Sequence, residues 1–254
     1  MPKIEIKNLK FCYYPNKNQE VVAIDDLTIS FKANSITAID DLTISFKANS
    51  ITAIVGPSGC GKSTLLKTLC GLLDYEGEIL VDDKDYSLVD FKERNLSYID
   101  QEMTLNNKIT IYENMAFPLL MKKLPRQEID KRIKEVAIEL GIAHCLALYP
   151  NQLSIGQCQK VLLAKALVKQ PTILLCDEAF SNLDLENSRK NAQFLKNYSE
   201  KHGITVLFVT HNFKEIQNIV DEIKVLDNGK LIFDGDNKSI YSTSNDLVKA
   251  IIES

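Results

Sequence analysis

Apolar positions recur along the chain with two different periods, one typical of strands and one typical of helices. Segments with the first period alternate with segments that have the second. Alternating or continuous apolar runs predict strands, whereas apolar residues spaced three and four apart predict helices. Strands are predicted over residues 4–14, 51–55, 77–81, 96–99, 172–176, 205–209, 222–226 and 230–233. Strands interleaved with helices are typical of an α/β domain.

The helical segments lie between these strands. The first follows the run at 51–55 and places Leu65, Leu66, Leu69 and Leu72 on one face. The middle of the chain is helical in pattern, with a break at Pro125, and is the one candidate for a subdomain. Helices are predicted over residues 62–73, 111–148, 156–168, 185–202 and 246–252.

A stretch of fifteen residues occurs twice in direct succession. The letters AIDDLTISFKANSIT occupy residues 23–37 and again residues 38–52. Within each copy, alternation predicts a strand with one buried face, then a turn and the start of a second strand. Because the second copy alone runs directly into the following apolar strand, we expect it to occupy the sheet. Leu42, Ile44 and Phe46 should then be buried, and most of residues 24–38 displaced toward the surface.

Composition narrows the class of protein. The 254 residues carry a formal net charge of -4, which gives no electrostatic reason to expect nucleic acid as a partner. No apolar run has the length of a membrane span, so work at a membrane needs a partner that spans it. The N-terminus is predicted to be a strand rather than a signal peptide. The six cysteines form no Cys-x-x-Cys pair, which argues against a zinc site or disulfide framework and fits a reducing cytosol.

A glycine-rich segment follows the strand at 51–55 and opens the next helix. Gly56-Pro-Ser-Gly-Cys-Gly-Lys-Ser63 fits the pattern G-x-x-x-x-G-K-[ST] in the strand–loop–helix context that phosphate binding requires. Successive backbone N–H groups and the helix N-terminus favour phosphate there. Lys62 is expected to reach the β- and γ-phosphates, and Ser63 to offer an oxygen to Mg²⁺.

Three further strands end in polar residues. The strand at 172–176 runs into Asp177 and Glu178; in a nucleotide site the first acid holds Mg²⁺ and the second polarises water. His211 follows the strand at 205–209, and Gln101 follows the strand at 96–99. A lone histidine at a strand end is most often structural or solvated, but these strand ends should face one crevice.

Ser154 stands in Leu-Ser-Ile-Gly-Gln at the start of a predicted helix. An N-cap explains this serine without any ligand.

The order of these motifs resembles the ATP-binding cassette family from end to end. It runs from the phosphate loop through Gln101, Leu-Ser-Ile-Gly-Gln, Asp177-Glu178 and Ser-Asn-Leu-Asp184 to Thr210-His211. The resemblance implies an α/β P-loop NTPase core with a mainly parallel sheet, an N-terminal antiparallel β-subdomain and a helical signature subdomain. It also implies one ATP-binding domain over residues 1–254, with the helical subdomain at about 103–168 and the duplicated segment at 23–52.

The resemblance further implies a composite site that binds ATP and Mg²⁺ between two cassettes arranged head to tail. One cassette caps, through Ser154, Gly156 and Gln157, the ATP bound on the other. In this site the Mg²⁺ ion is held by Ser63, Gln101 and Asp177, and Gln101 also holds the attacking water. Glu178 is the general base, and His211 contacts the γ-phosphate. Tyr14 matches the aromatic residue that stacks on adenine, with Tyr13 as the rival. The loop residues on the nucleotide are Gly56, Pro57, Ser58, Gly59, Cys60, Gly61, Lys62, Ser63 and Thr64.

Two positions depart from the family pattern. Ile155 stands where the commonest signature has glycine, and Ala179 replaces the usual proline after the catalytic glutamate. Ile155 is tolerated if its side chain points away from the γ-phosphate, and Ala179 is expected to loosen its turn. Both concern the rate rather than the reaction.

Residues 91–119 resemble bacterial importer ATPases, especially those for carbohydrates and other small solutes. This resemblance implies a homo- or heterodimer of ATP-binding subunits, in the cytoplasm on the inner face of the cell membrane. Its membrane contact is made only through transmembrane permease subunits, which dock at residues 101–119. Two alternatives stay open: a soluble nucleotide switch, and a nucleotide-binding module whose turnover the duplication has impaired.

Overall fold

Two β-sheets form the framework of the computed structural model, which describes residues 3–13, 36–90, 93–101, 104–181 and 183–253. The four-stranded sheet A is antiparallel, and its strand order is β2-β1-β4-β5. Sheet B has six strands in the order β10-β9-β3-β8-β7-β6. The bounds in sheet A are β1 Ile4–Tyr13, β2 Ile36–Phe46, β4 Glu76–Val81 and β5 Lys84–Asp85. Those in sheet B are β3 Ile51–Val55, β6 Leu96–Ile99, β7 Ile173–Asp177, β8 Thr205–Val209, β9 Glu222–Asp227 and β10 Lys230–Gly235.

Sheet B is parallel except at β10, and its central strands are buried on both faces. β3, β7 and β8 are buried at every residue, which explains why they are continuous apolar runs in the sequence. Their side chains alternate between two cores: Val206 and Phe208 belong to one, whereas Leu207 and Val209 belong to the other. Sheet B is therefore the central layer of the molecule.

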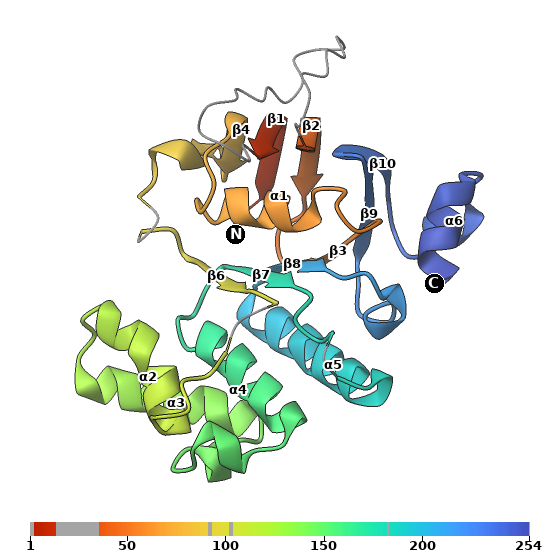
Figure 1. The fold of residues 1–254 in the computed structure, drawn as a ribbon. Helices are drawn as coiled ribbons and strands as arrows, with labels where there is room; N and C mark the ends of the chain where they lie inside the picture. Colours follow the sequence, from red (N-terminus) through yellow and green to blue (C-terminus); the bar gives the residue numbers. More distant parts are fainter. Residues whose placement is uncertain (1–2, 14–35, 91–92, 102–103, 182, 254) are drawn as a thin grey trace.

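Different elements cover its two faces (Figure 1). α1 and sheet A lie on one side of β6, β7 and β8, whereas α2 to α5 lie on the other. Among the described residues, no helix combines the length and apolar character that crossing a membrane requires. The helices are α1 Lys62–Leu69, α2 Ile111–Met121, α3 Arg126–Glu139, α4 Ile155–Leu167, α5 Leu185–His202 and α6 Asp246–Glu253.

Residues 38–46 of the second copy form most of β2. Leu42, Ile44 and Phe46 are 1–3% exposed, which confirms the sequence prediction for these side chains. β2 pairs with β1 in an antiparallel register that places Ile44 opposite Ile6. Ile36 and Thr37, the last two residues of the first copy, begin the strand. The predicted displacement of the rest of that copy lies outside the described residues.

The first helix is shorter than its sequence predicts. The pattern extends it to residue 73, but α1 ends at Leu69 and Gly71 has a φ of 72°. Leu72, predicted on the buried face, is consequently 54% exposed. A left-handed residue ends a helix by turning the chain away from its axis, and apolar spacing does not reveal that turn.

Candidate nucleotide site

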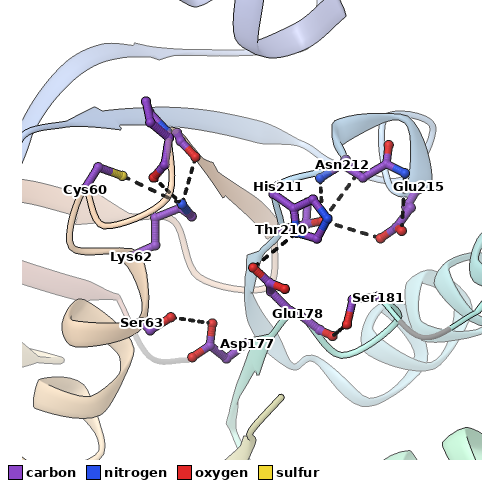
Figure 2. Close-up of polar contacts among 12 residues, drawn as sticks. Cys60, Lys62, Ser63, Asp177, Glu178, Ser181, Thr210, His211, Asn212 and Glu215 are labelled. Atoms are coloured by element: carbon purple, nitrogen blue, oxygen red, sulfur yellow. Dashed lines mark hydrogen bonds and ion pairs between the residues drawn. The ribbon is translucent and has the colours of Figure 1, made fainter. Parts of the chain in front are cut away.

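The carboxyl ends of β3, β7 and β8 bring the candidate residues to one edge of sheet B. β8 lies between the other two strands, and Asp177 pairs with Val209. Thr210 donates its backbone N–H to the carbonyl of Ile54, at 3.4 Å. Residues separated by more than a hundred positions in sequence therefore face one another, as Figure 2 shows.

The loop after β3 requires glycine at two positions. Gly56 has a φ of 154°, and a Cβ there would lie 2.1 Å from the carbonyl oxygen of Leu226. Gly61 has a φ of 102°, and a Cβ would lie 2.0 Å from the carbonyl oxygen of Ala38. Any side chain at either position would thus be strained and would displace backbone. The loop is fixed between the start of β2 and the end of β9.

The N-terminus of α1 is open to an anion. Its N-cap is Gly61, no described side chain caps it, and its first turn contains no acid. Lys62 is buried, and its Nζ donates to the carbonyl oxygens of Gly56 and Pro57, at 2.8 Å each. An uncapped helix N-terminus beside a lysine ammonium offers backbone N–H groups, a positive dipole end and a cation together. This arrangement fits a phosphate group.

Ser63 and Asp177 meet directly below the loop (Figure 2). The Ser63 hydroxyl donates to Oδ1 of Asp177 at 2.9 Å. Asp177 is 3% exposed, and burial raises the pKa of its carboxyl. A hydroxyl and a carboxylate are the hard oxygen donors that Mg²⁺ prefers beside substrate phosphates. The residues present therefore fit a magnesium ion, and among those described no group of three or more His, Cys, Asp or Glu side chains offers a rival metal site.

Sequence reasoning missed Tyr98, which also contacts Asp177. Its hydroxyl donates to Oδ2 of Asp177 at 3.0 Å. Burial and the neighbouring Asp177 carboxylate raise the pKa of Tyr98, so the phenol keeps its proton. Tyr98 belongs to β6, which pairs with β7. Only that strand order brings the two side chains together, so the linear motifs carried no signal for this contact.

Glu178 and His211 form the second contact in the site. Glu178 has a φ of 49°, and its backbone N–H donates to the carbonyl of Val209 at 2.9 Å. Its Oε1 lies 3.1 Å from Nδ1 of His211. A positive φ is uncommon for a residue other than glycine and recurs at functional sites. Here it accompanies the turn that leads the chain out of β7.

A network missed at the sequence level lies behind His211. Glu215 is 7% exposed, and its two carboxylate oxygens lie 3.4 Å from the Thr210 hydroxyl and from Nδ2 of Asn212. The Thr210 hydroxyl accepts the backbone N–H of Asn212 at 3.0 Å. Burial raises the pKa of the Glu215 carboxyl. Hydrogen bonds therefore hold the loop on both sides of His211. The only hint of this network in the sequence is an acid, Glu215, four residues after the histidine.

The remaining loop residues and Gln101 occupy less constrained positions. Pro57, Ser58 and Gly59 are exposed, whereas Cys60 and Thr64 are buried. Gln101 is exposed in the turn after β6, and it makes no hydrogen bond to Ser63 or Asp177 within the described part of the chain. That Gln101 helps to hold Mg²⁺ and the attacking water stays a prediction. Tyr14, predicted to stack on adenine, lies outside the described residues, as does the side chain of Tyr13.

Ser154, Gly156 and Gln157 lie at the start of α4, across sheet B from α1 (Figure 1). The Ser154 hydroxyl accepts the backbone N–H of Gln157 at 3.2 Å, and the Gln157 side chain accepts that of Ser154 at 2.9 Å. This capping box confirms the N-cap interpretation. The structure thus does not bring these residues to their own phosphate loop.

The segment Ser154–Gln157 borders a cavity of about 540 Å³. Its lining also includes Asp184, Asn187 and Lys190. Ile155 is 67% exposed there, and an added Cβ on Gly156 meets nothing within 4 Å. The turn at Ala179 retains two hydrogen bonds from Ser181 to the Glu178 carbonyl. Whether these two departures change the rate is not decided by these contacts.

A P-loop, two strand-end acids and a separate signature helix on a mainly parallel sheet define the class of the ATP-binding cassette. A family model described as ABC transporter matches residues 39–181, and the chain belongs to this family. A dimeric ATP-binding cassette solved in a post-hydrolysis state bound to ADP and Pi superposes with a TM-score of 0.75 at 28% identity. The match covers 92% of this chain and 98% of that one. The predicted fold class is confirmed.

Two curated relatives are named as import ATP-binding proteins. The chain is 39% identical over 194 residues to a molybdate/tungstate import ATP-binding protein of Pyrococcus abyssi, covering 76% of this chain and 56% of that protein. It is 36% identical over 247 residues to a glucose import ATP-binding protein of Saccharolobus solfataricus, covering 95% and 65%. The chain thus spans little more than half the length of the first relative.

Proposed function

We propose that the protein is the ATP-binding and ATP-hydrolysing subunit of a membrane importer for a small solute. The observation that carries the proposal is the Ser63–Asp177 contact beside the uncapped N-terminus of α1. It joins an anion site to a pair of hard oxygen donors, which is the combination a magnesium–nucleotide complex needs.

Each side chain has a role in this proposal. Lys62 exchanges its two loop carbonyls for the β- and γ-phosphate oxygens of ATP. Ser63 and Asp177 hold Mg²⁺, assisted by Gln101 from the end of β6. When bound, Mg²⁺ neutralises charge that develops on the phosphates. Glu178 accepts a proton from the attacking water, and His211 keeps the Glu178 carboxylate oriented while it contacts the γ-phosphate.

The active unit in this proposal is a homo- or heterodimer of ATP-binding subunits. Because α4 starts across sheet B from the phosphate loop, Ser154, Gly156 and Gln157 act on ATP bound to the second subunit. The dimeric state of the solved cassette supports this arrangement. Adenine stacking on Tyr14 completes the site, and residues 1–254 act as one domain with a helical subdomain at about 103–168.

The partners we propose are transmembrane permease subunits, which hold the protein on the cytoplasmic face of the membrane. The import proteins among the relatives support this assignment. The permease docks along residues 101–119, a segment that ends on α2, where Phe117 is 56% exposed. One of these relatives is named for import of the oxyanions molybdate and tungstate, and the other for import of glucose. We therefore assign the transported substrate only as a small solute.

The test is phosphate release by the purified protein with ATP, in Mg²⁺ and in excess EDTA. We expect turnover in Mg²⁺, none in EDTA, and loss of turnover in Lys62→Ala. Lys131→Ala, an exposed lysine on α3, is the matched control and should leave turnover unchanged. Affinity purification of the tagged protein from solubilised native membranes, with identification of the integral membrane proteins that co-purify, tests the partner. Absence of turnover in Mg²⁺ would refute the ATPase assignment, and turnover that persists in EDTA or in Lys62→Ala would refute the assigned site. A protein that never co-purifies with a transmembrane permease would refute the transport assignment.

A further inference from the structure

Tyr98 contacts the oxygen of Asp177 that Ser63 leaves free. The carboxylate accepts from the Ser63 hydroxyl on Oδ1, at 2.9 Å, and from the Tyr98 hydroxyl on Oδ2, at 3.0 Å. Each oxygen therefore has its own donor, and the donors come from different elements, α1 and β6. A carboxylate held at both oxygens cannot rotate about its terminal torsion without breaking a hydrogen bond.

The two donors differ in what a bound metal would do to them. Ser63 is itself expected to coordinate Mg²⁺ through a lone pair of its hydroxyl oxygen, so this oxygen would be shared between the ion and the contact with Asp177. Tyr98 donates to the other carboxylate oxygen, Oδ2, and is not a predicted metal ligand, so it can keep its hydrogen bond when the ion binds. Its ring packs against the core shared by sheet A and α1, which fixes the position of the hydroxyl.

We propose that Tyr98 is a positioning residue for the magnesium site. By holding Oδ2 of Asp177, its hydroxyl keeps Oδ1 directed toward Ser63 and the phosphate loop before the metal arrives. The inference rests on the proposed function, because it assigns Tyr98 to the Mg²⁺–nucleotide site described there. Outer-shell hydrogen bonds of this kind orient metal ligands, and their loss typically weakens metal binding by about 10- to 100-fold.

Tyr98→Phe separates positioning from packing, because it removes the hydroxyl and retains the ring. The measurement is binding of a fluorescent ATP analogue, first in EDTA and then across a titration with Mg²⁺. We expect unchanged affinity in EDTA and an intact fold, although the nucleotide-free protein should melt a few degrees lower because a buried carboxylate oxygen loses its donor. The Mg²⁺ concentration at half-maximal effect should rise by about tenfold, the lower end of the range for such hydrogen bonds.

Tyr112→Phe is the matched control. Tyr112, on α2, also donates its hydroxyl to a carboxylate, that of Asp130 on α3, far along the chain from the phosphate loop. Its loss should not alter the Mg²⁺ requirement. Tyr98→Met, which retains an apolar side chain without a hydroxyl, should reproduce the shift of Tyr98→Phe and provides a second variant if the first melts early.

An unchanged Mg²⁺ requirement in both Tyr98 variants would overturn the proposal, as would an equal rise in Tyr112→Phe. These outcomes are distinct from failure of the proposed function. In that case the wild-type protein itself would show no Mg²⁺-dependent binding of the analogue, whereas here the wild type responds to Mg²⁺ and only the variants decide.

Discussion

Nδ1 of His211 lies 3.1 Å from Oε1 of Glu178, so the histidine after β8 is directed toward the acid that ends β7. The two strands are neighbours in sheet B, and the backbone N–H of Glu178 also donates to β8, at the carbonyl of Val209. Backbone and side chain therefore fix Glu178 together. A general base acts on water only if its carboxylate is held in place, and this pair supplies that restraint.

Replacing Glu178 with glutamine should separate ATP binding from hydrolysis. Glutamine has the same shape but cannot accept the proton from water, so turnover should fall by about a hundredfold. Binding of ATP should persist, because the phosphate loop is untouched, and a stable ATP-bound dimer should accumulate. Phosphate release and sedimentation measure the two effects. Glu186→Gln on the exposed face of α5 is the control, and equal turnover in the two variants would exclude Glu178 as the base.

Ser154→Ala should lose more than helix stability. The matched variant is Thr110→Ala, because Thr110 caps α2 in the same capping box, with Glu113 as partner. Each should cost about 1 kcal/mol of unfolding free energy. With Glu178→Gln present, ATP-driven dimerisation should fail in Ser154→Ala and persist in Thr110→Ala. If both variants dimerise equally well, Ser154 serves only as a cap.

The periodicity of the chain predicted most strands of sheet B because its central strands β3, β7 and β8 are buried at every residue. β6 and β8 begin and end where the apolar runs do, and α5 likewise. The predicted end of α1 was wrong because the left-handed conformation of Gly71 ends the helix. Apolar spacing reveals neither the φ of this glycine nor the exposure of Leu72 to solvent.

The site divides in the same way. Residues within contiguous motifs, such as Lys62 and Asp177, were predicted because a loop or a strand end places them unaided. Tyr98 was not, because its contact depends on β6 lying beside β7, a tertiary pairing between segments far apart in sequence. The helix cap at Ser154 was predicted, yet the separation of α4 from α1 by a whole sheet was visible only in three dimensions.

Glu215→Gln should change how stability depends on pH. Burial raises the pKa of Glu215 above its ordinary value of 4.5, although His211 opposes the shift and Glu178 reinforces it. An acid whose folded pKa is raised binds protons more tightly in the folded state. Its contribution to stability is therefore largest at pH below 4.5 and falls as pH rises through the folded pKa. Stability of the glutamine variant relative to wild type should rise between about pH 4.5 and neutrality, as urea unfolding at each pH measures. A flat difference would contradict this sign.

Deleting residues 23–37 should leave the fold intact. The deletion joins Val22 to Ala38. Val21 and Val22 then take the places of Ile36 and Thr37 before Ala38, and all four residues are β-branched. Shortening the connection between β1 and β2 saves about 1 kcal/mol of loop-closure entropy. The melting temperature and the affinity for Mg²⁺–ATP should therefore be equal or higher. A deletion that unfolds the protein would show that the repeat is structural.

A matched pair of substitutions tests which copy belongs to the sheet. Ile29 and Ile44 have identical neighbours for several residues on either side, because they occupy the same position in the two copies. Ile44 is 3% exposed and faces Ile6 across the β1–β2 ladder, so Ile44→Asp buries an unpaired carboxylate. It should cost about 4 kcal/mol or more, since burying a charge without a partner is among the most destabilising changes. Ile29→Asp should cost less than about 0.5 kcal/mol, as expected of a surface position. Urea unfolding of both variants gives the comparison. Equal losses would show that both copies contribute to the core, and a larger loss in Ile29→Asp would place the first copy in the sheet.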